Sequence, residues 1–275
     1  MTSPTGPSSA SIPVQTGLSP NRSFATLRTI MALILREMSS RYGRTPGGYV
    51  WAVLEPIGAI LILSFGFALL LRSPSLGNSF ILFYATGFLP FNLYQTIANM
   101  VARAINFSRP LLFYPSVTWL DAILARFLLN TLTSVMVAYL LLTIIFHTID
   151  TTIVLDIPPI IGAMMLTAFL GLGVGTMNCL LMGLYPTWEL IWSIATRPLF
   201  LASGVIFIYE DMPQTAQDIL WYNPLLHLTG YMRMGFYPSY HPDYLSLPYV
   251  FAISLICLTL GLLLLRRHYK TILNF

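Results

Sequence analysis

Long uncharged stretches, rich in apolar residues, recur along this chain of 275 residues. Between consecutive Asp, Glu, Lys and Arg residues, they cover 56–71, 73–102, 127–149, 157–188 and 244–265. Several of them reach the roughly 20 residues that an α-helix needs to cross a bilayer. The pattern therefore predicts a polytopic helical membrane protein.

We expect an all-α polytopic membrane fold with six transmembrane helices. The predicted spans are 50–71, 79–102, 118–146, 158–183, 188–209 and 246–265. The predicted regions are a disordered tail at 1–21, an interface helix and loop at 22–48, a membrane domain at 49–266 with an external loop at 210–245, and a C-terminal tail at 267–275. An even number of spans places both termini on the same side of the membrane.

The segment before the first span combines helical spacing of apolar residues with several arginines. The apolar positions are Phe24, Leu27, Met31, Ile34, Leu35, Met38 and Tyr42. This spacing predicts a basic amphipathic helix that lies in the cytoplasmic headgroup layer. We expect Arg36, Arg41 and Arg44 to attract the anionic head or sugar of a substrate towards the cytoplasmic entrance.

The external loop contains two short apolar segments separated by Asn223-Pro224. Neither segment is long enough to span a bilayer, so we expect two short re-entrant helices before the last span, stabilised by protein or a cavity. The hairpin that they form is a candidate periplasmic gate. Its candidate residues are Trp221, Tyr222, Asn223, Pro224 and Tyr231.

The composition agrees with a membrane protein and sets its orientation. Charged residues make up 9% of the chain, against roughly 25% in soluble domains, which excludes a soluble globular protein. Lys and Arg number five in 22–44, three in 103–126 and three in 266–270, with Arg72 and Arg233 on the opposite side. This distribution predicts cytoplasmic termini. Because the basic residues lie at membrane borders, the net charge of +4 does not indicate a nucleic-acid partner.

The residues that ATP binding, metal binding or catalysis would need are missing. Lys270 is the only lysine and no glycine loop precedes it, so the chain lacks a phosphate-binding loop for ATP. The His and Cys residues do not have the spacing of a metal site. We therefore expect a transport subunit that is not an enzyme and binds no cofactor or metal itself, with ATP hydrolysis in a separate chain.

Charged and aromatic residues inside the spans are candidates for a substrate pathway. Glu55 and Arg197 lie within the first and fifth spans and could meet, either as a structural pair or along a route for an anionic substrate. Asp121 and Arg126 lie nearer the border and suggest an intrahelical or loop-anchoring pair. Tyr84 and Phe88 belong to aromatic clusters near the outer ends of spans. Such clusters form an interfacial belt or stack on sugars.

Three blocks of sequence follow one another in order. They read LREMSSRYGRTPGGYVWAVLEP at 35–56, NFSRPLLFYPSVTWLDAILAR at 106–126, and RPLFLASGVIFIYEDMP with WYNPLLHL at 197–213 and 221–228. Together they resemble the ABC-2 type permeases that export capsular polysaccharide. Tyr222 separates Trp221 from the Asn-Pro pair, and Pro110 follows Arg109, which departs from the family pattern.

The resemblance implies a homodimer in the bacterial inner membrane that exports a lipid-linked, usually acidic polysaccharide. It also implies a separate nucleotide-binding ATPase that holds ATP and Mg²⁺, a periplasmic adaptor of the polysaccharide co-polymerase type, and an outer-membrane exporter. The ATPase is expected to dock on a coupling helix within 106–115, and its candidate contacts are Asn106, Arg109, Leu111, Leu112 and Tyr114.

The leading hypothesis is therefore an ATP-driven permease that moves a capsular polysaccharide from cytoplasm to periplasm. The alternative is an ABC-2 permease for O-antigen, teichoic acid or a small amphipathic molecule. A membrane enzyme would need a set of catalytic acids, and an ion-coupled carrier would need several buried carboxylates. Of the carboxylates in the spans, only Glu55 clearly qualifies.

Overall fold

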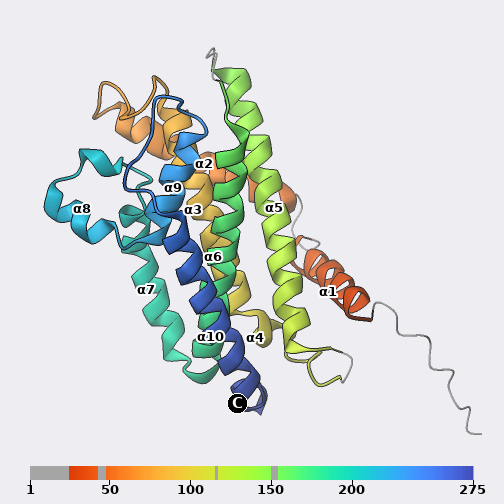
Figure 1. Cartoon of the computed structure of the whole chain (residues 1–275). Coiled ribbons are helices and arrows are strands. Elements are labelled where there is room, and N and C mark those ends of the chain that lie inside the picture. Colours follow the sequence, from red (N-terminus) through yellow and green to blue (C-terminus); the bar gives the residue numbers. More distant parts are fainter. Residues whose placement is uncertain (1–24, 43–47, 115–116, 150–153, 275) are drawn as a thin grey trace, which may run out of the picture.

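The computed structural model describes residues 25–42, 48–114, 117–149 and 154–274, and these residues form helices and no strand (Figure 1). Arg44 and Pro115 therefore lie outside the described residues. The elements are α1 (Ala25–Tyr42), α2 (Gly48–Ala68), α3 (Phe80–Ala102), α4 (Ala104–Ser108), α5 (Trp119–Thr148), α6 (Ile157–Leu184), α7 (Thr187–Ala202), η1 (Tyr209–Asp211), α8 (Gln214–Leu220), α9 (Pro224–Met234) and α10 (Leu247–Asn274).

Helix α3 lies at the centre of the helical bundle. Of its 23 residues 15 are buried, and it packs against α2, α5, α6 and α9. Two glycines of α6 allow a close approach to α3, because a Cβ added at Gly171 would lie 3.0 Å from the Cβ of Ile97, and one at Gly175 would lie 2.8 Å from the Cβ of Val101. Such small residues let apolar helices pack closely in membranes.

By length and composition, four helices of the described chain are suited to cross a membrane. They contain the segments Val50–Ala68, Trp119–Thr148, Ile157–Leu184 and Leu247–Leu273. The other two predicted spans correspond to α3, which carries several polar residues, and to α7, which has only 16 residues. The prediction of six spans is thus supported for four helices and stays a prediction for α3 and α7.

Two predicted boundaries differ from those of the structure. The span predicted at 188–209 ends as a helix at Ala202, and Gly204 follows with a left-handed φ of +69°, which favours glycine. The span predicted at 246–265 continues as α10 to Asn274. Basic residues end the apolar run there but are good helix formers, so the helix persists beyond it.

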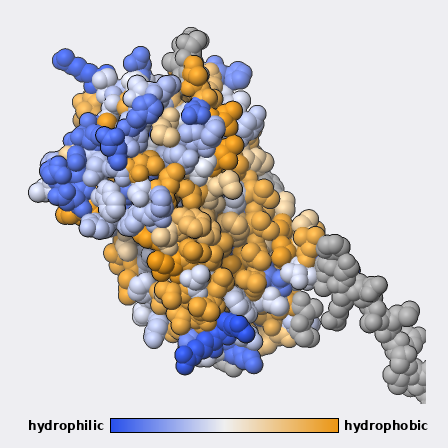
Figure 2. All heavy atoms as spheres, viewed as in Figure 1, coloured by the Kyte–Doolittle hydropathy of each residue, from blue (hydrophilic) through white to orange (hydrophobic). Residues whose placement is uncertain are grey.

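On the face shown in Figure 2, a broad hydrophobic area covers the middle of the molecule. A more polar region lies over α8 and neighbouring loops at one end, and a small, strongly hydrophilic cluster lies at the other. This distribution suits a protein with its middle in a bilayer.

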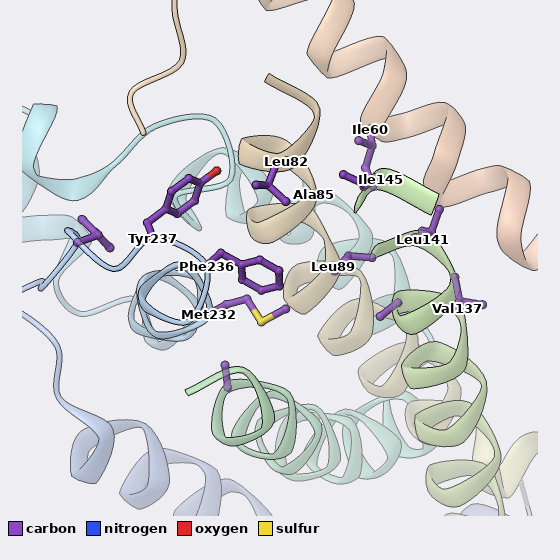
Figure 3. Packing of buried hydrophobic residues seen from close by; sticks show 13 residues of the cluster. Ile60, Leu82, Ala85, Leu89, Val137, Leu141, Ile145, Met232, Phe236 and Tyr237 are labelled. Carbon is purple, nitrogen blue, oxygen red and sulfur yellow. The ribbon is translucent and has the colours of Figure 1, made fainter. Parts of the chain in front are cut away.

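The largest buried cluster joins α9 to the spans around it. In Figure 3, Met232 and Phe236 lie between α3 and α6, and Ile60, Val137, Leu141 and Ile145 come from α2 and α5. Its buried members are Ile60, Leu82, Ala85, Leu89, Val137, Ala138, Leu141, Ile145, Ala163, Met232, Phe236, Tyr237 and Tyr240. The end of the external hairpin is therefore part of the membrane domain's core.

Candidate functional site

Helix α3 carries a polar stripe along one face. Its members are Asn92, Gln95, Thr96, Asn99 and, just past the helix end, Arg103. Separations of three, four, seven and eleven residues from the first member place all five on the same side of a helix. The first four side chains are half-buried and Arg103 is exposed.

The polar stripe borders two cavities. One, of about 240 Å³, lies between α2, α3 and α5 and is lined by Glu55, Asn130, Thr133 and Ser134 in addition to residues of the stripe. The other, of about 410 Å³, lies between α3 and α7. Gln95 and Asn99 line both cavities, so we treat the two as one polar groove.

The α7 side of the polar groove contains arginines and a single carboxylate. The guanidinium Nη2 of Arg103 lies 2.7 Å from Oε1 of Glu189, and each side chain is 55% exposed. Arg197, Ser193 and Thr196 line the same cavity. Two guanidiniums against one carboxylate leave a net positive charge that can attract an anionic group.

The expected pathway residues occupy different positions relative to the polar groove. Glu55 and Arg197 are both exposed but line opposite cavities, and no ion pair joins them within the described chain. The expected contact between these two side chains is therefore wrong for the single chain. Tyr84 is 1% exposed and packs against Phe83, while Phe88 is half-buried beside Phe200. Neither ring lines the polar groove.

A buried ion pair attaches α1, the predicted interface helix, to α5. Nε of Arg126 lies 3.2 Å from Oε2 of Glu37, with side-chain exposures of 7% and 5%, and Nη1 of Arg126 donates to the carbonyl of Met100 at 2.8 Å. The expected pair between Asp121 and Arg126 is wrong, because Asp121 forms a capping box with Thr118 at the start of α5.

Helix α4, which covers only the start of the predicted coupling segment 106–115, joins this ion pair through an aromatic ring. Cζ of Arg126 lies 4.2 Å, and Cζ of Arg36 lies 5.2 Å, from the ring centre of Phe107. Contacts of this kind are attractive cation–π interactions. Arg36 is thus half-buried against α4. Arg41 lies in the last turn of α1.

The predicted coupling residues divide into anchored and exposed ones. Nη2 of Arg109 donates to the carbonyl of Leu273 at 2.9 Å, which attaches the segment to α10. Leu111 packs on α1 and Leu112 on the cluster near the end of α10. Asn106 is exposed and Tyr114 is 62% exposed, as is the neighbouring Phe113 at 67%. These exposed side chains are available to a partner.

The predicted external hairpin consists of two short helices, α8 on the surface and α9 largely buried. Asn223 joins them: its Oδ1 accepts from the N–H of Leu225, and its Nδ2 donates to the carbonyl of Ala202 at the end of α7. Asn223 and Pro224 line a cavity of about 340 Å³ that shares Trp192 and Thr196 with the polar groove. The hairpin break thus borders the groove.

The remaining gate candidates, Trp221, Tyr222 and Tyr231, contact neighbouring segments of the chain. Nε1 of Trp221 donates to the carbonyl of Tyr244 at 3.2 Å. Tyr222 is 69% exposed, and its carbonyl accepts from the hydroxyl of Tyr249 at 2.8 Å. The Tyr231 ring packs against Gly162, where an added Cβ would approach it to 2.7 Å.

Two residues of α9 that the sequence did not mark as important are central to this packing. Arg233, predicted as an external basic residue, is 2% exposed, and its guanidinium donates to the carbonyls of Phe207 and Val205. His227 is fully buried, with Nε2 donating to the carbonyl of Trp221 and Nδ1 accepting from the N–H of Ser246. The sequence signal for their burial was that both lie among apolar residues on a short predicted helix.

Similarity to known proteins agrees with this geometry. Residues 28–237 match the ABC-2 type transporter family. The chain is 31% identical over 246 residues to the polysialic acid transport protein KpsM of Escherichia coli, covering 90% of this chain and 95% of that protein. It is 27% identical to two capsule polysaccharide export inner-membrane proteins, CtrC of Neisseria meningitidis serogroup A and BexB of Haemophilus influenzae, covering 88% of this chain and 92% of each relative. The chain therefore belongs to the ABC-2 type transporter family, whose members in capsule export systems are transport subunits that work with an ATPase subunit.

Proposed function

We propose that this chain is the permease of an ATP-driven exporter that moves a lipid-linked acidic capsular polysaccharide from cytoplasm to periplasm. The observation that carries the proposal is the polar groove beside α3. Polar side chains within a membrane domain are costly and commonly mark a substrate pathway. Amide and hydroxyl groups are suitable partners for sugar hydroxyls.

The charges on the α7 side of the polar groove favour an acidic polymer. Arg103 and Arg197 line the α7-side cavity, where Glu189 is the only carboxylate. A polymer carboxylate can bind Arg197 and compete with Glu189 for Arg103, because an exposed ion pair is weak. The KpsM relatives are named for transport of polysialic acid, which is an acidic polymer. The arginines of α1 would attract the same polymer at the cytoplasmic entrance.

The proposal includes a homodimer with six spans in each chain and cytoplasmic termini. Helix α7 has one buried residue, Thr196, and it exposes Leu190, Ile191, Ile194 and Leu201. A second copy against this side would cover the apolar residues of α7 and enclose the polar groove. The excess of Lys and Arg near the termini supports the orientation.

The external hairpin would close the outer end of the pathway. A polysaccharide route that stayed open would leak ions, so a gate has to close at rest. The bond from Asn223 to the end of α7 and the cavity beside Pro224 support this role. Ile219 and Tyr222 are 74% and 69% exposed, and they offer a surface to a periplasmic adaptor that leads to an outer-membrane exporter.

The test is deletion of the gene in a strain that makes the polymer, followed by chemical analysis of what remains inside the cells. We expect an acidic polysaccharide with a lipid at its end to accumulate, and surface polymer to return with the wild-type gene. Accumulation of O-antigen, teichoic acid or a small amphipathic molecule, or no accumulation, would contradict the proposed substrate.

A further inference from the structure

One face of α10 is left uncovered by the rest of the chain. Ile256, Leu260 and Leu263 are 55%, 46% and 64% exposed. Their spacing of four and three residues places them on one side of the helix, and we call them the apolar strip. The opposite side of α10 includes Ser254 and Gly261, which contact α6.

The apolar strip continues directly into cationic residues. Arg267 and Lys270 follow Leu263 at spacings of four and three residues, and both are exposed. At 1.5 Å per residue, Ile256 and Arg267 are separated by about 16 Å along the helix. That length matches the roughly 15 Å of hydrocarbon in one leaflet of a bilayer.

The cations border a cavity that also contains aromatic rings. The cavity has a volume of about 530 Å³ and is lined by Trp119, Arg266, Arg267, Tyr269 and Lys270. We call it the basic–aromatic cavity. The rings of Trp119 and Tyr269 lie 6.3 Å apart between centroids, and such rings favour the headgroup level of a membrane. Strongly hydrophilic residues gather at this end of the molecule, next to hydrophobic surface (Figure 2).

We propose that this face of α10 is a binding site for one anionic glycerophospholipid. The phosphate lies in the basic–aromatic cavity, and an acyl chain lies along the apolar strip. Basic pockets at membrane borders recognise anionic headgroups in this way. In the orientation proposed above the site faces the cytoplasmic leaflet, but lipid binding does not depend on which polymer is exported.

Charge and length together select this occupant. A second copy of the chain would bring the same cations opposite one another, which is unfavourable for like charges. A neutral lipid would use the apolar strip and leave the cations without a partner. Free phosphate would use the cations and leave the apolar strip unused. An anionic phospholipid satisfies both parts of the surface.

The experiment measures lipid binding by the purified full-length protein in a neutral detergent, by native mass spectrometry. The probes are phosphatidylglycerol, phosphatidylcholine with the same acyl chains, and inorganic phosphate. We expect phosphatidylglycerol to bind at least about 10-fold more tightly than phosphatidylcholine. The double variant Arg267→Gln and Lys270→Gln should weaken phosphatidylglycerol binding about 30-fold, since each basic residue near an anionic surface contributes about fivefold.

Two further variants separate the sources of binding. Arg72→Gln removes a positive charge at an exposed position away from α10 and should change affinity less than about twofold. Leu260→Ser with Leu263→Ser should weaken the binding of phosphatidylglycerol and leave the binding of phosphate unchanged. The proposal would be overturned if the two lipids bound equally well, or if phosphate alone bound tightly. It would also be overturned if the Arg267 and Lys270 variant kept its lipid affinity and changed its dimer fraction instead.

Discussion

At the scale of single residues, Arg233 shows how a buried charge can hold a short helix in place. Its guanidinium donates to the carbonyl of Phe207 at 2.8 Å and to that of Val205 at 3.0 Å, and its Cζ lies 4.2 Å from the ring centre of Phe83. A buried cation is costly unless such partners are present. Arg233 thereby joins α9 to the loop after α7.

We predict that Arg233→Lys destabilises the protein by about 2–4 kcal/mol, because a lysine keeps the charge but cannot bridge both carbonyls with a planar fork. Thermal unfolding in detergent would measure the loss. Arg72→Lys, at an exposed arginine, is the matched control and should have little effect. Equal unfolding temperatures for the two variants would argue against the bridging role.

The pKa of His227 lies below its ordinary value of 6.5, because burial disfavours the charged form more than the bond to the Trp221 carbonyl favours it. The unfolded chain therefore takes up a proton near pH 6.5 and the folded chain does so only at lower pH. The contribution of neutral His227 to the free energy of unfolding is fully present above about pH 6.5 and is lost as the pH decreases. The total loss is about 1.4 kcal/mol for each unit by which the pKa of His227 differs between the unfolded and folded chains.

We accordingly predict that the wild-type unfolding temperature drops between pH 7.5 and pH 5. His227→Gln should lower the unfolding temperature at both pH values but reduce the change between them, since glutamine does not titrate. Measuring both proteins at the two pH values provides the check. A pH dependence that stays the same in the variant would assign it to other groups.

Partners of single side chains were the least predictable feature. The Asn223-Pro224 break between two short helices followed from local sequence, because proline and the Asn cap act on adjacent residues. The partner of Arg126 did not, since Glu37 lies 89 residues away. The polar stripe of α3 was readable from its helical spacing but was overlooked, because the span is apolar on average.

At the scale of elements, α1, α4 and α5 are connected through the Glu37–Arg126 pair and the ring of Phe107. If the predicted coupling segment docks an ATPase, its movement would therefore reach α1 through these contacts. Arg109 connects the same segment to the end of α10.

We predict that Glu37→Ala lowers stability by about 3–5 kcal/mol, because it removes the Glu37 carboxylate from the buried guanidinium of Arg126. Glu189→Ala is the control: it breaks an ion pair whose side chains are 55% exposed, which should change stability by less than about 1 kcal/mol. Denaturation in detergent compares the two. Similar losses of stability in the two variants would show that burial does not determine how much an ion pair contributes to the free energy of unfolding.

We predict that Phe113→Ala with Tyr114→Ala weakens copurification of the ATPase and reduces export without lowering the unfolding temperature, because both side chains are largely exposed. Leu112→Ala should instead lower the unfolding temperature, since Leu112 packs against buried residues. Undiminished ATPase recovery with the first variant would remove this segment from the docking surface.

The existence of the helices was more predictable than their ends. Hydropathy located α2, α3, α5 and α6 within a few residues of the predicted spans. It misplaced the ends of α7 and α10, because a helix ends at its caps and not where the apolar run ends. For α7, the local signal for the end of the helix was Gly204, which adopts a positive φ.

At the scale of the whole molecule, we propose that the polymer passes along the polar groove of α3. The cavity between α2, α3 and α5, the cavity on the α7 side and the cavity beside the external hairpin are neighbours, since each shares lining residues with the next. The single chain leaves this side open at α7, whose apolar residues are exposed.

The most direct measurement is site-specific photo-crosslinking during active export. A photoreactive residue at Asn99, in the polar groove, is compared with one at Met165, which is 68% exposed on α6. We predict that polymer becomes attached at Asn99 and not at Met165, and that attachment requires ATP hydrolysis by the partner subunit. Equal labelling at both positions, or no labelling at Asn99 while export proceeds, would contradict it.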